Sequence, residues 1–390
     1  MNNLPIQIFN RGFDQLAHPE IRLFSQRYSA FQVCGLLGFC LGVILLSLLA
    51  KHLELSFLII LSLIVVAPIS FLLLAWIMKV VIGRERLIYY HHLIAIVLVS
   101  ALLLWQLNQP VWVYLDILVL GIGLTHACIR IGCLMVGCCH GKPCAWGICY
   151  GNAYQNSGFT PYYLQVRLFP IQGIEALWGF FILLVGITLI WQGSIPGEVS
   201  VWYLVTYGWG RFYCEFWRGD PATSYWRGFS EAQWTSLLLM STLVGAGLGG
   251  FVPLQKWPIL ASICVATTMI TLSLKRQFQP TKTYRLLNPC HVQEVYQALK
   301  LATQLTPESS NLSSCQVACT SLGIKISASR IKIEGRHIHH YTFSDKTGNM
   351  TQATARIIAK LILQFTQSFD LIEFIERSQG VFHLLIYPAA

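Results

Sequence analysis

Two long apolar runs decide the fold class: FQVCGLLGFCLGVILLSLLA, residues 31–50, and SFLIILSLIVVAPISFLLLAWIM, residues 56–78. A helix needs about 20 mostly apolar residues to cross the hydrocarbon core of a bilayer, and both runs have that length. The sequence predicts an all-α polytopic membrane domain of about seven to eight transmembrane helices. The other predicted spans are residues 88–107, 111–129, 172–191, 198–216, 232–252 and 257–274.

The composition of the whole chain agrees with a membrane protein. Of its 390 residues, 55% are hydrophobic and only 11% are charged, whereas soluble domains carry about 25% charged residues. The first 30 residues are mixed polar and aromatic, so we expect an interfacial segment there and no cleavable signal peptide. Nothing in the sequence indicates a nucleic-acid partner.

A change in composition near Lys275 predicts a second domain. We expect a transmembrane domain over 31–275, a linker over 276–284 around Pro280, and a small soluble α+β domain over 285–390. Helical periodicity marks residues 292–305 and 351–365, and alternation marks strands at 324–335, 337–343 and 380–388. The predicted order is helix, two-stranded hairpin, helix, strand.

The distribution of positive charge predicts the orientation in the membrane. With eight spans, most lysines and arginines outside the spans fall on one side, and Lys51 and Lys256 fall on the other. Positively charged loops stay in the cytoplasm. We therefore expect a bacterial cytoplasmic membrane protein with its C-terminal domain and its 130–171 loop in the cytoplasm. That compartment keeps thiols reduced, which suits the many cysteines near this loop.

The densest polar segment is HACIRIGCLMVGCCHGKPCAWG, residues 126–147, at the end of the fourth apolar run. Ionisable residues at membrane depth are costly and usually functional. The segment carries His126, Arg130, His140 and Lys142, and its glycines Gly132, Gly137 and Gly141 allow close backbone approach to a ligand. The alternative is a cationic helix end that reaches the interface, with glycines that serve tight packing.

Two further segments carry polar groups in apolar surroundings. In YGWGRFYCEFWRGDP, residues 207–221, the spacing of Arg211, Glu215 and Arg218 places all three on one helix face. A fixed guanidinium group can grip a phosphate with two hydrogen bonds, and the alternative is an arginine–glutamate pair that ties helices together. In FPIQGIEALWGF, residues 169–180, Gln172 and Glu175 lie where a helix enters the bilayer. An ordinary interfacial helix start is the alternative there.

These three segments, in this order, resemble the prolipoprotein diacylglyceryl transferases over about residues 80–250. The matching positions are Arg130-Ile131-Gly132 with Gly137, Gly141 and Lys142, then Pro170, Gln172 and Glu175, then Arg211-Phe212, Glu215-Phe216 and Arg218. The resemblance implies a transferase that moves the diacylglyceryl group of phosphatidylglycerol to a thiol and releases glycerol phosphate. It implies no cofactor.

The resemblance also implies residue roles. Arg130 and Arg211 would hold the phosphoglycerol and stabilise the charge that builds on the departing phosphate, and Glu215 would orient Arg211. The remaining predicted substrate-binding positions are Gly132, Cys133, Gly137, Cys138, Cys139, His140, Gly141, Lys142, Gln172, Glu175 and Arg218.

The chain departs from the family pattern at several positions. Cys133 stands where the family has its signature asparagine and Cys138 where it has a glutamate, and Tyr90 aligns with the family's histidine. Tyr90, His91 and His92 are therefore candidates for moving the thiol proton, because an imidazole titrates near neutral pH. The family acts on the outer face of the membrane, whereas the charge distribution places this loop inside.

The cysteine-rich run CLMVGCCHGKPC, residues 133–144, also raises the question of a metal site. Structural zinc sites usually pair their ligands at short regular spacings. The spacing here is irregular, and the adjacent Cys138 and Cys139 cannot point the same way on a helix. We therefore expect small, soft packing residues beside the headgroup pocket and no metal, and a thiol that accepts the lipid group covalently is the other alternative.

The sequence leaves the acceptor open. Residues 285–390 are predicted to recruit a protein or peptide acceptor to a membrane-embedded enzyme. The alternative function is a non-catalytic lipid-binding scaffold or signalling protein on the same fold. A transporter would be indicated by an inverted repeat with paired broken helices, and the sequence shows neither.

Overall fold

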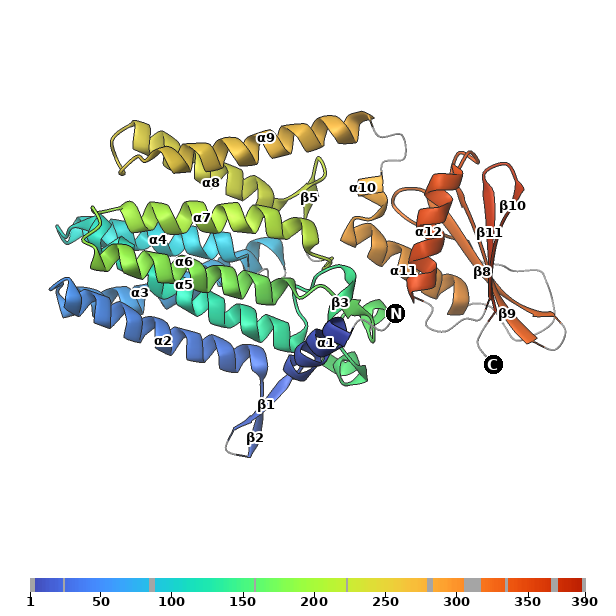
Figure 1. The fold of residues 1–390 in the computed structure, drawn as a ribbon, viewed down its shortest axis with the longest axis horizontal. Helices are drawn as coiled ribbons and strands as arrows, with labels where there is room; N and C mark the ends of the chain where they lie inside the picture. Colours follow the sequence, from blue (N-terminus) through green and yellow to red (C-terminus); the bar gives the residue numbers. More distant parts are fainter. Residues whose placement is uncertain are drawn as a thin grey trace. The chain divides into compact units, whose positions relative to one another are not determined.

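A computed structural model describes residues 4–23, 25–83, 88–157, 159–221, 224–278, 283–304, 317–333, 336–365 and 371–387 of the chain (Figure 1). The chain forms two compact units. The first comprises Met1–Gly219 and Phe229–Met269, and the second comprises Asp220–Gly228 and Ile270–Ala390.

The first unit is a bundle of long helices at the positions that the apolar runs predict. The helices are α2 Ala30–His52, α3 Phe57–Ile82, α4 Tyr89–Gln106, α5 Val111–Val136, α6 Ile171–Trp191, α7 Glu198–Cys214, α8 Glu231–Leu248 and α9 Lys256–Phe278. In the described part of the chain, six of these, namely α2, α3, α4, α5, α6 and α9, are long and apolar enough to cross a membrane. The prediction of an all-α polytopic domain is confirmed.

Short elements precede the bundle and connect its helices. They are α1 Leu4–Leu16, β1 Glu20–Leu23, β2 Gln26–Ser29, β3 Pro143–Cys149, η1 Asn152–Ser157, η2 Pro161–Tyr163, β4 Arg167–Leu168, η3 Glu215–Trp217, β5 Tyr225–Trp226 and β6 Phe229–Ser230. Helix α1 and the β1–β2 hairpin occupy the predicted interfacial segment.

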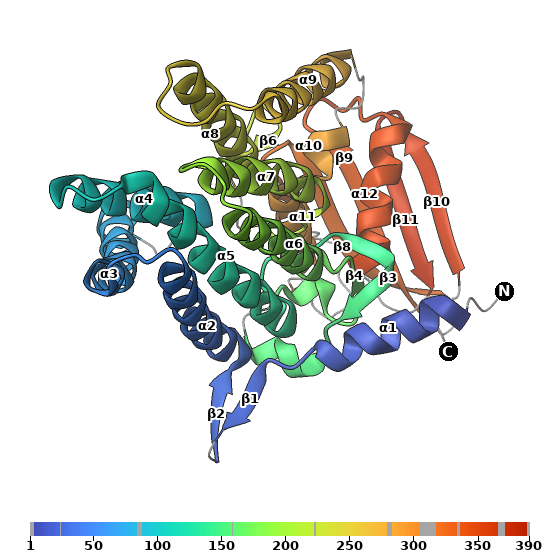
Figure 2. The same ribbon diagram turned by 60° about the vertical axis from the view of Figure 1, so that its left-hand side comes forward.

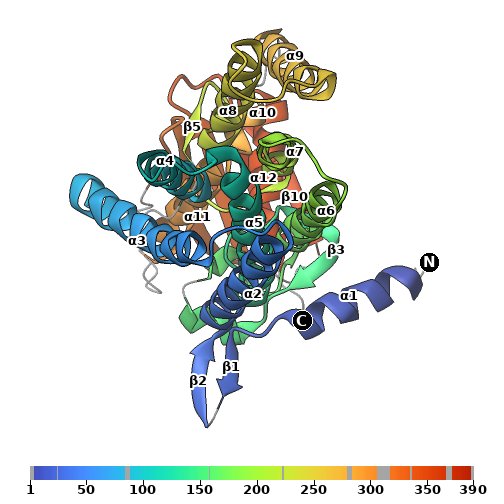
Figure 3. The same cartoon turned by 90° about the vertical axis from the view of Figure 1, so that its left-hand side faces the viewer.

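Helix α5 forms the centre of the bundle. In its most apolar stretch 72% of residues are buried, against at most 39% in the other candidate spans, and α2, α4, α6 and α7 pack around it (Figure 3). The contact with α2 is closest at Gly38 and Gly42, where an added Cβ would lie 2.7 Å from Cys128 Cβ and from the Gly121 carbonyl oxygen respectively. Such small residues let membrane helices approach backbone to backbone.

A buried carboxylate on α5 organises the start of α7. Asp116 is 3% exposed, and its two oxygens accept the backbone N–H groups of Gly197 and Ser200, each at 2.7 Å. The first N–H groups of a helix have no partner within that helix. Asp116 therefore caps α7 from a neighbouring helix and fixes where α7 begins.

We expect Asp116→Ala to destabilise the bundle by about 1–3 kcal/mol for each amide left without an acceptor in a buried position. Thermal unfolding of the detergent-solubilised protein measures this effect. Asp116→Asn retains one carbonyl acceptor and is expected to lie between the wild type and Asp116→Ala. Equal unfolding temperatures for all three proteins would contradict the capping role.

The second unit is an α+β domain built on a five-stranded antiparallel sheet of order β10-β11-β9-β8-β7. Its elements are α10 Thr283–Leu286, α11 Pro289–Gln304, β7 Val317–Cys319, β8 Ile324–Ile333, β9 Arg336–Asp345, α12 Gln352–Phe365, β10 Leu371–Ser378 and β11 Val381–Tyr387. Helix α11 packs against β8, and α12 lies beside α11 (Figure 2).

The predicted helix–hairpin–helix–strand order is present, and the prediction missed β7 and β10. These are the two edge strands: β7 has three residues, and β10 carries Glu373, Glu376 and Arg377. Short and charged edge strands are common because they discourage pairing with other chains. For the same reasons, neither strand shows a clear alternation of apolar residues in the sequence.

Candidate functional site

Helix ends meet at the polar segments that the sequence singles out. Arg130 lies near the end of α5, Glu175 near the start of α6 and Arg211 near the end of α7. All three side chains are at most 8% exposed. The bundle therefore encloses charged groups contributed by three different helices.

Five buried side chains form an alternating sequence of ion pairs, which we call the arginine–glutamate chain. Its contacts are Arg130 Nε to Glu175 Oε2 at 3.1 Å, Arg211 Nη1 to Glu175 Oε1 at 2.9 Å, Arg211 Nη1 to Glu215 Oε2 at 2.7 Å, and Arg218 Nε to Glu215 Oε2 at 3.8 Å. Buried charges persist only when they are paired or bind a ligand. Within these five residues, three guanidinium groups face two carboxylates, which favours an anionic ligand.

The contacts leave hydrogen-bond donors at two arginines. Among the described residues, Arg130 uses Nε and Arg211 uses Nη1 to bind the carboxylates. In that part of the chain, no ion pair uses the other nitrogens of these two side chains. A guanidinium group offers five N–H donors in a planar fork that matches phosphate oxygens. The predicted roles of Arg130 and Arg211 remain predictions, and their geometry suits a phosphate.

Glu175 has a larger part than the sequence suggested. We predicted it as a substrate-binding position, and the structure places it between Arg130 and Arg211 in contact with both. Gln172, one turn earlier on α6, is fully buried and donates from Nε2 to the Cys138 carbonyl oxygen at 2.8 Å. The start of α6 thus links the arginines to the cysteine-rich loop.

The prediction that Arg211, Glu215 and Arg218 share one helix face is wrong in part. Helix α7 ends at Cys214, Glu215 opens a short 3-10 turn, and Arg218 is extended with φ −71° and ψ 141°. The i,i+4 pair of Arg211 and Glu215 forms as expected. Arg218 reaches Glu215 from the chain beyond the helix.

The loop after α5 is held to two other parts of the site. Gly137 ends the helix with φ +82°, a conformation that glycine adopts without strain. The His140 carbonyl accepts the Gly219 N–H, and the Lys142 N–H donates to the Trp217 carbonyl, both at 2.9 Å. Residues 137–142 are therefore fixed beside the end of the Arg211–Arg218 segment.

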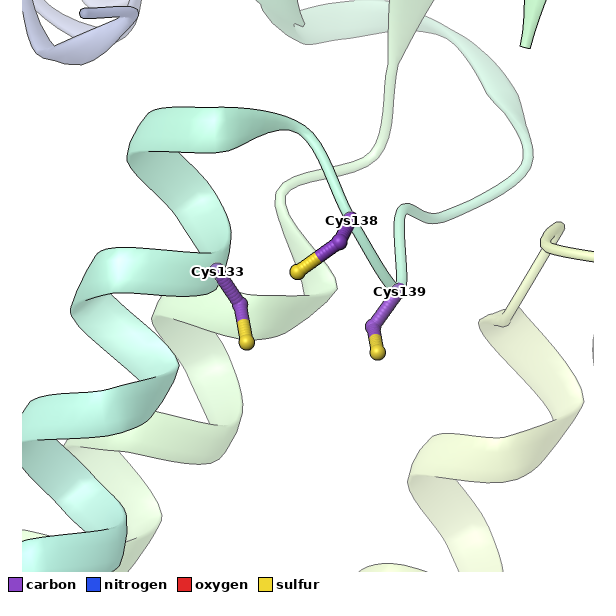
Figure 4. A group of neighbouring side chains, drawn as sticks. All are labelled: Cys133, Cys138 and Cys139. Carbon is purple, nitrogen blue, oxygen red and sulfur yellow. The ribbon is translucent and has the colours of Figure 1, made fainter. Parts of the chain in front are cut away.

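Three cysteines of this region converge, and we call them the cysteine trio: Cys133, Cys138 and Cys139. Their sulfur atoms lie within 4.8 Å of one another (Figure 4). The expectation that Cys138 and Cys139 point apart is wrong, because it assumed a helix. Since α5 ends at Val136, both residues lie in the loop, and Cys139 has φ +54°.

Four other predicted binding residues have structural contacts. The His140 ring packs against Phe159 and Tyr163, and its Nε2 lies 3.1 Å from the Thr160 hydroxyl. Gly132 faces α2, where an added Cβ would lie 2.9 Å from Cys34 Cβ. Gly141 and Lys142 contribute backbone contacts to the segment 217–218. Their predicted roles in substrate binding remain predictions.

The candidate bases at the start of α4 have partners of their own. The Tyr90 hydroxyl lies 2.6 Å from the Ser236 hydroxyl, His91 Nε2 lies 3.3 Å from Glu231, and the His92 ring packs on Phe71 at 4.2 Å. Within the described part of the chain, no ion pair joins Tyr90, His91 or His92 to the arginine–glutamate chain. A role for them in proton transfer stays a prediction.

His126 is one of the polar residues of 126–147, and the sequence predicts no role for it. The structure places it next to the arginines. It is 6% exposed and lies one helical turn before Arg130. Its ring stacks on Tyr89 at 3.6 Å, and Nε2 lies 3.4 Å from the hydroxyl of Tyr207, which is one turn before Arg211. The i,i+4 spacing from Arg130 was the signal that could have identified it.

An apolar cavity of about 370 Å³ lies between α2, α3, α4 and α5. Leucine, isoleucine, phenylalanine and glycine residues form most of its wall. Polar groups enter the wall at Tyr89, His92, Thr125 and His126. The cavity therefore extends from an apolar interior to the helix turn that precedes Arg130.

Comparison with known proteins agrees with this geometry. The sequence profile of the prolipoprotein diacylglyceryl transferases matches residues 21–248, more than half of the chain. The chain belongs to this family. The match covers every residue of the arginine–glutamate chain and the cysteine trio.

Individual members of the diacylglyceryl transferase family match over shorter stretches. A phosphatidylglycerol–prolipoprotein diacylglyceryl transferase of Clostridium tetani is 36% identical over 117 residues, which is 29% of this chain and 44% of that protein. A second, from Clostridium perfringens, is 31% identical over 128 residues, 32% of this chain and 47% of its own length. One from Streptococcus agalactiae is 32% identical over 100 residues, which is 23% of this chain and 38% of that protein. The matches span less than half the length of these relatives.

We expect Glu175→Gln to destabilise this diacylglyceryl transferase family member strongly. The substitution removes the charge that both Arg130 and Arg211 contact, and breaking a buried ion pair from one side costs about 3–5 kcal/mol. Thermal unfolding in detergent measures the loss. Glu20→Gln is the matched control, because the Glu20–Arg27 pair is exposed and such pairs contribute about 0–1 kcal/mol. Similar unfolding temperatures for both variants would refute a central role for Glu175.

Proposed function

We propose that this protein transfers a diacylglyceryl group from an anionic phospholipid, phosphatidylglycerol, to an acceptor thiol. The observation that carries the proposal is the buried arginine–glutamate chain, in which Arg130 and Arg211 each contact the carboxylates through one nitrogen. Membership of the diacylglyceryl transferase family supports the reaction class. The printed names of the relatives supply the donor and describe those proteins' acceptor as a prolipoprotein.

The donor lipid fits the arrangement of cavity and charges. An acyl chain would lie in the apolar cavity between α2, α3, α4 and α5, and the phosphate would bind the guanidinium groups beyond it. The glycerol carbon that joins these two parts would then lie near His126, where the cavity wall becomes polar. We assign His126 and Tyr207 to positioning this junction.

The reaction is a substitution at that glycerol carbon. The acceptor thiolate forms a carbon–sulfur bond, the carbon–oxygen bond to the phosphate breaks, and its electron pair stays on the phosphate oxygen. Glycerol phosphate leaves with one more negative charge than the phosphodiester had. Cations fixed in advance stabilise that charge in the transition state, and Glu175 and Glu215 hold Arg211 in place for it.

Lipid mass spectrometry tests the proposal on membranes of cells that express the wild type, Arg130→Lys, Arg211→Lys or no protein. Lysine keeps the charge and loses the fork, so we expect transfer to fall by about 100-fold or more, the usual effect of removing one transition-state donor. Arg27→Ala removes an exposed arginine and should match the wild type. All variants are compared at equal membrane abundance.

Depletion of phosphatidylglycerol, or a product heavier by one diacylglyceryl group, is expected from the wild type and the Arg27→Ala control alone. If the wild-type profile equals that of cells without the protein in the native host, the transferase proposal fails. The site would then bind lipid without reacting, and the scaffold function would become the better account.

We also propose that the protein lies in the bacterial cytoplasmic membrane with its C-terminal domain in the cytoplasm. An even number of helices, α2 to α9, returns the chain to the side on which it began, and most lysines and arginines outside the spans fall on that side. The helix ends that carry Arg130 and Arg211 would open to the cytoplasm. The acceptor would therefore be a cytoplasmic thiol, recruited by residues 285–390.

Reporter fusions test this orientation. A fluorescent protein joined after Ala390 should be bright, because it matures in the cytoplasm, and alkaline phosphatase at the same position should be inactive. The same reporters placed after Glu54, in the turn between α2 and α3, should give the opposite pattern. Active phosphatase at the C-terminus would reverse the topology and place the acceptor outside.

A further inference from the structure

The cysteine trio has the geometry of a metal site rather than of packing residues. Three thiols whose sulfurs lie within 4.8 Å of one another can reach one ion with small side-chain movements. A tetrahedral zinc centre with bonds of about 2.3 Å spaces its sulfurs by about 3.8 Å. Cys133 is buried, Cys139 is half-buried and Cys138 is exposed. The cluster thus has one buried side and one accessible side.

The backbone holds these thiols in place from three directions. Cys133 is on α5, the Cys138 carbonyl accepts a hydrogen bond from the buried Gln172, and the neighbouring His140 carbonyl accepts the Gly219 N–H. The left-handed backbone at Gly137 and Cys139 turns the loop back toward α5. Such outer contacts orient metal ligands before the ion binds.

Zinc binds cysteine as the thiolate, so an ion at this site would release the thiol protons as it binds.

We propose that Cys133, Cys138 and Cys139 bind one thiophilic divalent ion, Zn²⁺, whose fourth position stays open on the exposed side and takes the acceptor thiol. This inference rests on the proposed function for the role of the fourth position, while the ion site itself stands on the geometry. Three protein ligands with an open position are typical of catalytic zinc. The positions involved include Cys133 and Cys138, where the family has asparagine and glutamate.

The site would supply a second way to deprotonate the acceptor thiol. Tyr90 occupies the position of the family's histidine, and its hydroxyl is engaged with Ser236. A thiol that binds zinc is deprotonated outright. The acceptor thiol would replace a bound water, and its proton would leave with that water into solvent. Held by Cys133, Cys138 and Cys139, the ion would present this sulfur as a thiolate to the glycerol carbon. The carbon–sulfur bond would form as the carbon–oxygen bond to glycerol phosphate breaks, and the thioether product, a weaker ligand, would be replaced by water.

The position of the trio fits this role. Cys133 lies three residues after Arg130 on α5, and Arg130 contacts Glu175 at the centre of the arginine–glutamate chain. A sulfur held at the trio would therefore lie beside the groups that we assign to the phosphate. Cytoplasmic thiols stay reduced, which keeps the three cysteines available to an ion.

The first experiment measures metal in the full-length protein, purified in detergent without chelator. We expect about one zinc ion per chain in the wild type, and at least a tenfold lower occupancy in Cys133→Ser, Cys138→Ser and Cys139→Ser. Cys144→Ser, in β3 and outside the trio, is the matched control and should keep its zinc. Size-exclusion profiles show whether each variant is folded. Equal zinc in the wild type and all three trio variants, or zinc-free wild type that takes up none from solution, would overturn the site.

The second experiment replaces zinc with Co²⁺, which is coloured. Bound cobalt should show a thiolate charge-transfer band and the intense visible bands of a four-coordinate ion, and Cys144→Ser should show the same spectrum. Addition of N-acetylcysteine amide should shift the visible bands, and N-acetylserine amide should leave them unchanged. A spectrum that does not change when the thiol is added would contradict an open fourth position on the metal.

The two measurements separate this inference from the proposed function. A cobalt spectrum that responds to the thiol in a protein that transfers no lipid would leave the metal site standing and reject the transferase. Wild-type lipid transfer that continues undiminished after all zinc is removed would keep the transferase and reject the metal's role in it.

Discussion

The placement of Glu175 between Arg130 and Arg211 is the constraint on which the rest of the site depends. Three helices, α5, α6 and α7, bring these charges into an apolar bundle, and desolvation of each charge is costly unless partners compensate it. The ends of these helices can therefore move little relative to one another. The loops that begin or end at these helices are therefore anchored at fixed points. The loop that carries Cys138 and Cys139 is one of them.

The same constraint explains why the site can differ from its family without losing its frame. The resemblance to the family aligns the arginines, Gln172, Glu175 and Glu215 with its motifs, and it aligns Cys133, Cys138 and Tyr90 with an asparagine, a glutamate and a histidine. These last three side chains take no part in the ion pairs. In the proposed mechanism, anion binding and thiol activation belong to separate residues, so one could change while the other stays.

The fold could be predicted from the sequence because long apolar runs have one physical interpretation. All eight predicted runs are helices, and the local pair Arg211–Glu215 forms as its spacing indicates. Contacts between distant segments could not be read in this way. Glu175 lies 45 residues from Arg130, and no local pattern shows that it bridges two arginines. The cysteine trio was missed because the end of α5 at Val136 decides the side-chain directions.

The short helix α7 has a consequence for the lipid around it. Its 17 residues rise about 25 Å, less than the bilayer's hydrocarbon thickness of about 30 Å. Because Asp116 fixes its start and ion pairs fix its end, the helix cannot lengthen to match. If α7 crosses the bilayer, its ends lie within the hydrocarbon thickness, and local thinning is one of the ways in which membranes adjust to short spans. Under the proposed function, a donor headgroup would then sink less far to meet Arg211, so hydrophobic mismatch would help to deliver the lipid.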